Sequence, residues 1–186
     1  MFKYLSKIVL ILLYLSSNSH SEVIKNIEIV GNKRISKETI LVLGNIKAET
    51  KFTDISLNNA LKALYETDFF SDIKFSISDN GLLKINVKEN PIIEKINING
   101  IKKKSFVENI YSLISLKDRT SFTDFKLERD ISLVKNILKT NGYYFSSIKV
   151  SSETDENLNS IILNLDINLG AKAKIKEILF IGDKNF

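Results

Sequence analysis

The sequence predicts an α+β fold: tandem small β-α-α-β-β domains, each a three-stranded sheet covered on one face by two helices. The first observation is an internal repeat, in which VIKNIEIVGNKRIS (residues 23–36) aligns with IIEKININGIKKKS (92–105) and KIKEILFIGDKNF (174–186). The second is that the first two copies are followed by the same order of helical and alternating patterns. The third is the only proline, Pro91, because proline is tolerated at the first residue of a strand. Pro91 therefore marks a domain boundary.

A glycine closes the alternating run in each copy of the repeat, at Gly31, Gly100 and Gly182. These glycines are 69 and 82 residues apart, which is the length of one small domain. The period is longer than that of most solenoid repeats and favours separate domains in series.

The first residues have the pattern of a secretory signal peptide. Lys3 and Lys7 precede or flank a short apolar run, Ile8 to Leu15, and small polar residues follow. A membrane anchor is the alternative, but a spanning helix needs about 20 apolar residues. We expect residues 1–19 to be a signal peptide and the chain to be exported.

The composition excludes several functional classes. The formal net charge is +5, far below the dense basic footprint of a nucleic-acid-binding protein. There is no cysteine, which excludes a disulfide framework, thiolate metal sites and cysteine nucleophiles. The only histidine, His20, lies at the predicted cleavage site. We predict no enzyme, no cofactor, no metal and no nucleic-acid partner.

The first predicted domain covers residues 22–90. Ser36 is placed to cap a helix that ends at Gly44, and a second helical pattern follows Asp54 or Ser56. Two alternating apolar runs then flank the turn sequence DNG, residues 79–81, which predicts a β-hairpin.

The second predicted domain covers residues 91–170 and repeats this order. Ser105 and Glu108 have the spacing of a capping box, and a longer helix follows residues 123–124 and ends at residues 141–142. Strands are predicted from about Tyr143 to Ser152 and from Ile161 to Leu169. Residues 171–186 are interpreted as the first strand of a truncated third domain, and the chain as a fragment of a larger protein.

Three other groups of residues are interpreted structurally rather than chemically. The carboxylates of DFKLERD (124–130), with Asp130 facing Lys126 one turn away, are predicted to form a solvated helix face with salt bridges. The lysines at 102–104 are predicted to form a solvated turn. The aromatic residues at 65, 69–70 and 143–145 are predicted to pack in the core at a helix–strand corner rather than to form a ligand cage.

The predicted sheets are small and open, so each has edge strands with unpaired backbone groups. Such an edge accepts an extended peptide as an added strand through main-chain hydrogen bonds. Most sheet edges in proteins are protected, so the pattern alone does not assign this role.

The segments IEIVGN, LYETDFFSDIKF, VKENPIIEKINING and NGYYFSSIKV resemble tandem polypeptide-transport-associated (POTRA) domains. The resemblance is greatest to those of the central subunit of the bacterial outer-membrane β-barrel assembly machinery (BAM). One departure is Asp68, where the family usually has glycine; Gly142 fits in the second domain.

The resemblance implies the periplasmic portion of a Gram-negative outer-membrane protein, linked to an outer-membrane β-barrel beyond residue 186. The implied partners are unfolded outer-membrane proteins, periplasmic chaperones and accessory lipoproteins of the assembly complex. The implied contact is strand addition along the second strand of each domain. The peptide-binding residues would then be Lys74, Phe75, Ser76, Ile77, Ser78, Ile148, Lys149, Val150, Ser151 and Ser152.

Two alternatives remain within the same superfamily. A two-partner-secretion transporter typically has only two such domains, and the start of a third favours the assembly factor. A structural protein of cell division carries one such domain behind an uncleaved anchor, and the cleavable leader and tandem domains argue against it.

Overall fold

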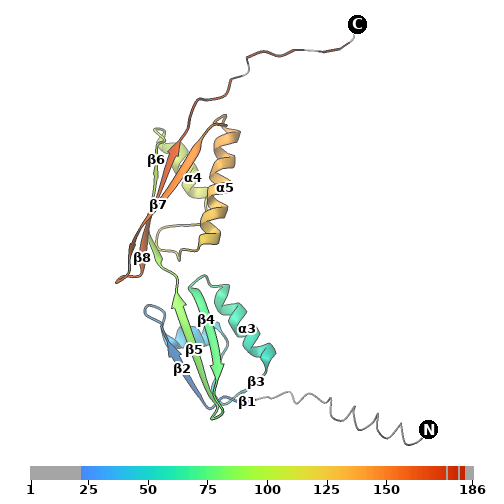
Figure 1. Cartoon of the computed structure of the whole chain (residues 1–186), viewed down its shortest axis with the longest axis vertical. Helices are drawn as coiled ribbons and strands as arrows, with labels where there is room; N and C mark the ends of the chain where they lie inside the picture. The colour runs from blue at the N-terminus through green and yellow to red at the C-terminus, as the bar shows by residue number, and fades with distance from the viewer. Residues whose placement is uncertain (1–21, 175, 180, 183–186) are drawn as a thin grey trace, which may run out of the picture. The chain divides into compact units, whose positions relative to one another are not determined.

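The computed structural model describes residues 22–174, 176–179 and 181–182 (Figure 1). The predicted signal peptide, residues 1–19, lies outside the described residues. The chain divides into two compact units, Met1–Glu89 and Asn90–Phe186.

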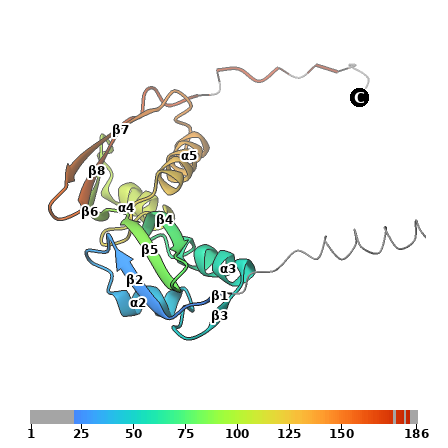
Figure 2. The same cartoon turned by 60° about the horizontal axis from the view of Figure 1, so that its bottom comes forward.

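The first unit contains a three-stranded sheet of order β2-β5-β4, in which β2 is parallel to β5 and β4 is antiparallel to it. Helices α2 and α3 connect the first strand to the hairpin, and Figure 2 shows both helices beside the sheet. A short second sheet pairs β1 with β3. The bounds are β1 (Glu22–Val23), β2 (Asn26–Val30), α2 (Lys37–Leu43), β3 (Lys51–Phe52), α3 (Asp54–Tyr65), β4 (Phe70–Ile77) and β5 (Leu82–Glu89).

The second unit repeats the topology with a sheet of order β6-β8-β7, again one parallel and one antiparallel pair. The predicted α+β architecture is therefore confirmed in both units. The bounds are β6 (Ile92–Asn99), α4 (Lys104–Leu113), α5 (Asp124–Thr140), β7 (Ser147–Asp155) and β8 (Ser160–Asn168).

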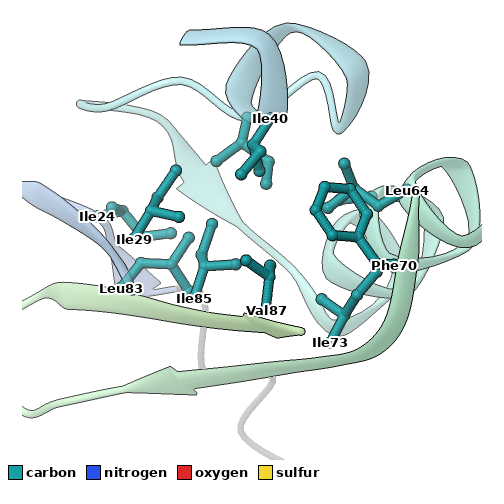
Figure 3. Packing of buried hydrophobic residues seen from close by; sticks show 11 residues of the cluster. Ile24, Ile29, Ile40, Leu64, Phe70, Ile73, Leu83, Ile85 and Val87 are labelled. Carbon is teal, nitrogen blue, oxygen red and sulfur yellow. The ribbon is translucent and has the colours of Figure 1, made fainter. Parts of the chain in front are cut away.

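Each unit has its own apolar core between the helices and one face of the sheet. In the first unit, Ile40 of α2 and Leu64 of α3 lie on the side of the sheet that carries Ile85 and Val87 (Figure 3). In the second, Ile110 of α4 and two residues of α5 pack on the central strand β8. Burying such side chains stabilises a domain by about 1.5–3 kcal/mol each, the main favourable term in a chain without disulfides.

The loop between the two helices is tied to the first strand in the first unit. The N–H of Ile24, a fully buried residue, donates to the carbonyl of Thr50 (3.3 Å), and the N–H of Glu49 donates to the carbonyl of Ile24 (2.7 Å). Glu49 has a φ of 61°, in the left-handed region, which turns the loop toward the strand.

The same exchange occurs in the second unit. Ile93, also fully buried, donates to the carbonyl of Thr120 (2.8 Å) and accepts from the N–H of Arg119 (2.7 Å). Arg119 also has a left-handed φ, 68°. The repeat seen in the sequence therefore extends to individual backbone hydrogen bonds.

The predicted helix starts at Ser36 and at residues 123–124 agree with the structure, whereas α3 begins at Asp54 itself rather than after it, and one capping prediction is wrong. The side chains of Ser36, Thr53 and Thr123 cap α2, α3 and α5. At α4, the N-cap is Lys103, which makes no side-chain cap hydrogen bond. The chain turns into α4 early enough that Ser105 already lies in its first turn, so the capping box predicted from Ser105 and Glu108 does not form.

The corner between α5 and β7 also differs from the prediction. The strand begins at Ser147 rather than Tyr143, because Tyr144 and Phe145 lie in a turn. Tyr143 packs near Phe106, with ring centroids 6.5 Å apart, but Tyr144 and Phe145 are 60% and 77% exposed. Tyr65 is also exposed, at 41%, so the prediction that all the corner aromatics pack in the core is wrong for these three.

Of residues 171–182, those that the structure describes form no strand. A strand is stabilised by pairing, and none of the described strands pairs with this segment. The N–H of Ala173 instead donates to the carbonyl of Gly142 (2.8 Å). The interpretation of residues 171–186 as the start of a third domain stays a prediction.

Candidate peptide-binding edges of the two sheets

Strand β4 is an edge strand, paired on one side with β5 only. The N–H of Ser78 donates to the carbonyl of Leu82 (3.0 Å), which fixes the alternation of the antiparallel ladder. In this register the backbone groups of Lys74 and Ser76 point toward β5. Those of Ile73, Phe75 and Ile77 therefore point away from the sheet.

One of these outward donors is already occupied. The N–H of Ile73 donates to the hydroxyl oxygen of Tyr65, at 3.0 Å. Among the described residues, no hydrogen bond of this kind reaches the N–H of Phe75 or Ile77. The outer side of β4 thus has open backbone groups at its C-terminal half.

A groove runs between this edge and helix α3, which lies alongside β4 in Figure 1. Its volume is about 470 Å³, and its floor is apolar because Ile73 and Phe75 direct their side chains to the helical face of the sheet. The lining residues are Asp54, Leu57, Asn58, Leu61, Ile73 and Phe75.

The opposite face of β4 is polar. The side chains of Lys74 and Ser76 are exposed, and the Lys74 ammonium lies 3.0 Å from the Asp72 carboxylate. A strand added to β4 would therefore have alternate side chains over an apolar groove and over a solvated surface.

Strand β7 is the corresponding edge in the second unit. The N–H of Ile92 donates to the carbonyl of Asn159 (2.9 Å), so the backbone groups of odd-numbered residues of β8 point toward β6 and those of even-numbered residues toward β7. The register pairs Lys149 with Asp166 and Ser151 with Asn164, so these residues of β7 point inward. The backbone groups of Ile148, Val150 and Ser152 point outward.

The structure therefore divides the ten predicted site residues into two classes. All lie on the two edge strands except Ser78, which directly follows β4. The outward backbone groups belong to Phe75, Ile77, Ile148, Val150 and Ser152, and the inward groups to Lys74, Ser76, Ser78, Lys149 and Ser151. Peptide binding at these residues stays a prediction.

The exposed pair Tyr144 and Phe145 lies immediately before β7 and was not predicted as part of a site. Large exposed aromatic side chains are enriched at binding surfaces because they bury much apolar area at low entropic cost. The three aromatic residues after Gly142 were visible in the sequence, but nothing in the pattern distinguished a turn from the start of a strand.

The carboxylates of α5 are arranged differently from the prediction. Asp130 is only 3% exposed, so the solvated face predicted for it is wrong. Its carboxylate accepts hydrogen bonds from the N–H of Ser115 (2.8 and 2.9 Å), the hydroxyl of Ser115 (2.9 Å) and the N–H of Leu116 (2.7 Å). The loop after α4 is held over α5 by this carboxylate, which therefore has a structural role.

Glu89 has a comparable role in the first unit. Its Oε1 accepts from the N–H groups of Lys33, Arg34 and Ile35 at 2.7–2.9 Å and fixes the loop between β2 and α2. Within the described part of the chain, no cluster of three or more acidic or histidine side chains is arranged to hold a metal ion. No helix there is both long and apolar enough to cross a membrane.

Comparison with known proteins identifies a family model, POTRA, described as surface antigen variable number repeat, which matches residues 22–90 and 91–170. The N-terminal domain of Omp85 from the thermophilic cyanobacterium Thermosynechococcus elongatus has a similar structure, with a TM-score of 0.51 at 15% identity. The match covers 80% of this chain and 63% of that one, and it supports the fold.

Two curated relatives are outer membrane protein assembly factors named BamA. The one from Nitratidesulfovibrio vulgaris is 24% identical over 164 residues, which is 87% of this chain and 21% of the relative. The one from Buchnera aphidicola is 25% identical over 180 residues, 94% of this chain and 29% of the relative. The chain thus spans between a fifth and a third of the length of these relatives.

Proposed function

This chain belongs to the POTRA family, and on that premise we propose that it is the periplasmic POTRA region of an outer-membrane protein assembly factor. In this role it binds unfolded outer-membrane proteins by strand addition to β4 and β7. It receives them from periplasmic chaperones, docks accessory lipoproteins of the assembly complex, and is linked to an outer-membrane β-barrel beyond residue 186. We propose no enzymatic activity for this chain.

The observation that carries the proposal is the alternation at the two sheet edges. At Phe75, Ile77, Ile148, Val150 and Ser152, outward N–H and C=O groups are placed to pair with an added strand. Main-chain pairing makes little demand on sequence, which suits a protein that binds many clients.

The side chains beside the β4 edge suit the alternating residues of an outer-membrane strand. Strands of outer-membrane barrels alternate apolar and polar residues. A segment of this kind, added to β4, would place its apolar side chains over the groove between Leu57, Leu61 and Phe75. Its polar side chains would lie beside Lys74 and Ser76, on the solvated face.

A proline at an outward position tests the proposal without removing a ladder hydrogen bond. Val150→Pro and Phe75→Pro each delete an outward N–H, and proline is tolerated on an edge strand in that orientation. The probe is a fluorescein-labelled peptide of about ten residues with alternating valine and threonine. Binding to the full chain is measured by fluorescence anisotropy, and circular dichroism establishes that each variant is folded.

We expect the double proline variant to bind the peptide at least about tenfold more weakly. Each substitution removes an outward N–H, and the proline ring also crowds the added strand. The matched controls are Lys74→Ala and Lys149→Ala, which change a neighbouring side chain but keep the outward backbone groups. Equal affinity of the folded double proline variant and the unsubstituted chain would overturn strand addition at these edges.

A further inference from the structure

The edge of β4 has one hydrogen bond that the edge of β7 does not have. The hydroxyl oxygen of Tyr65 accepts from the outward N–H of Ile73 at 3.0 Å. The register places Ile148 at the corresponding position of β7, since Lys74 pairs with Asn86 as Lys149 pairs with Asp166. No described side chain accepts from the N–H of Ile148.

The backbone around Tyr65 is held in place by its neighbours. Tyr65 is the last residue of α3 and follows Leu64, which is fully buried. The hydroxyl of Thr67 donates to the carbonyl of Leu64 (2.6 Å) and accepts from the N–H of Phe69 (3.2 Å), which closes the end of the helix.

Tyr65 also lies at one end of the groove beside β4. The groove residues on α3 are Asp54, Leu57, Asn58 and Leu61, and Tyr65 follows Leu61 by one turn of the same helix. Tyr65 is 41% exposed, and its hydroxyl contacts the outward N–H of Ile73 at the sheet edge. A peptide moving along the groove toward the start of β4 would meet this side chain.

Among the described residues, the second unit has no equivalent acceptor at the outer side of β7. Helices α3 and α5 both follow a threonine N-cap, Thr53 and Thr123. Counting from these caps, the position of Tyr65 is occupied in α5 by Lys135. Because α5 is longer, counting back from the left-handed residues after the two helices, Asp68 and Gly142, instead places Lys139 at the position of Tyr65. A lysine ammonium has donors only, so it cannot accept from a backbone N–H.

We propose that Tyr65 determines which residues of the first unit take part in strand addition. Its hydroxyl occupies the Ile73 donor, so an extended segment pairs with Phe75 and Ile77 and stops there. The β7 edge is open from Ile148 onward and takes a longer segment. This inference rests on the proposed function. An extended peptide of alternating apolar and polar residues would pair with fewer residues on β4 than on β7.

The variant Tyr65→Phe tests the inference, because it removes the hydroxyl and keeps the ring. In the free full chain, we expect the amide hydrogen of Ile73 to exchange with solvent about tenfold faster, as measured by nuclear magnetic resonance. Tyr111→Phe is the matched control, since the Tyr111 hydroxyl also accepts from a backbone N–H, that of Asp118 (3.2 Å), but in the loop after α4. It should leave the exchange rate of Ile73 unchanged.

The alternating valine–threonine peptide provides the binding test. With Tyr65→Phe, peptide-induced shifts should extend from the amides of Phe75 and Ile77 to that of Ile73, and the β4 edge should bind about fivefold more tightly. If the peptide shifts the amides of β7, Phe75 and Ile77 in the unsubstituted chain, and Tyr65→Phe changes neither the set of shifted amides nor the affinity, only the role of Tyr65 is overturned. If no amide of either edge shifts in any of these proteins, the proposed function itself is overturned, and the role of Tyr65 with it.

Discussion

The α-carbon of Gly100 packs directly against the backbone carbonyl of Ile167, so that a methyl group at this position would overlap the carbonyl oxygen. Gly31 has the same relationship to Val87 in the first unit. Both glycines have a left-handed φ, 86° and 92°. The repeated glycine therefore exists because the chain turns off the first strand while touching the central strand of its sheet.

Gly100→Ala should destabilise the second unit by at least about 2 kcal/mol, since either the strand end or the central strand must shift and the φ is unfavourable for alanine. The measurement is urea unfolding followed through the amide signals of residues 91–168. Gly182→Ala is the control, because no atom of the described residues lies within 4 Å of the added methyl group. Similar stability of the two variants would contradict this explanation of the glycine.

Asp130→Asn should lower the free energy of unfolding of the second unit by about 3 kcal/mol. The amide nitrogen that replaces one oxygen is a donor, and it would face the N–H groups of Ser115 and Leu116. Chemical denaturation checks the change. Glu128→Gln, on the exposed side of the same helix, should alter stability by less than about 0.5 kcal/mol, and an equal effect of both substitutions would show that the Asp130 contacts contribute little.

Glu89→Ala should destabilise the first unit by about 2–3 kcal/mol, because three N–H groups of the loop before α2 lose their common acceptor. The same substitution at Glu28, which forms a 3.5 Å ion pair with Lys84 at the surface, should cost less than about 1 kcal/mol. Thermal and urea unfolding measure the stability of the two variants. A smaller effect at Glu89 than at Glu28 would contradict the assigned role of Glu89.

The elements that the sequence predicted best are those determined by local rules. Ser36 caps its helix, and residues 79–81 form the hairpin turn after β4. The positions of Gly31 and Gly100 were found by aligning the chain with itself, although the reason for them, contact with the central strand, required the structure.

Contacts between distant segments could not be predicted in this way. Asp130 occupies a core position of α5, between Leu127 and Val134, and the corresponding residue of α3 is the buried Ala60. Its position on the apolar face of the helix could have indicated that Asp130 is buried. The sequence gives no sign, however, that the loop after α4 donates hydrogen bonds to its carboxylate. Similarly, no periodicity connects the hydroxyl of Tyr65 to the N–H of Ile73.

Amide hydrogen exchange of the full chain, with and without the alternating peptide, distinguishes strand addition from binding elsewhere on the two units. With strand addition, we expect an alternating pattern on β7: the outward amides of Ile148, Val150 and Ser152 become protected, while the inward amides of Lys149 and Ser151, already paired with β8, do not change. Protection that is uniform along β7, or confined to the helices while the outward amides stay unprotected, would contradict it.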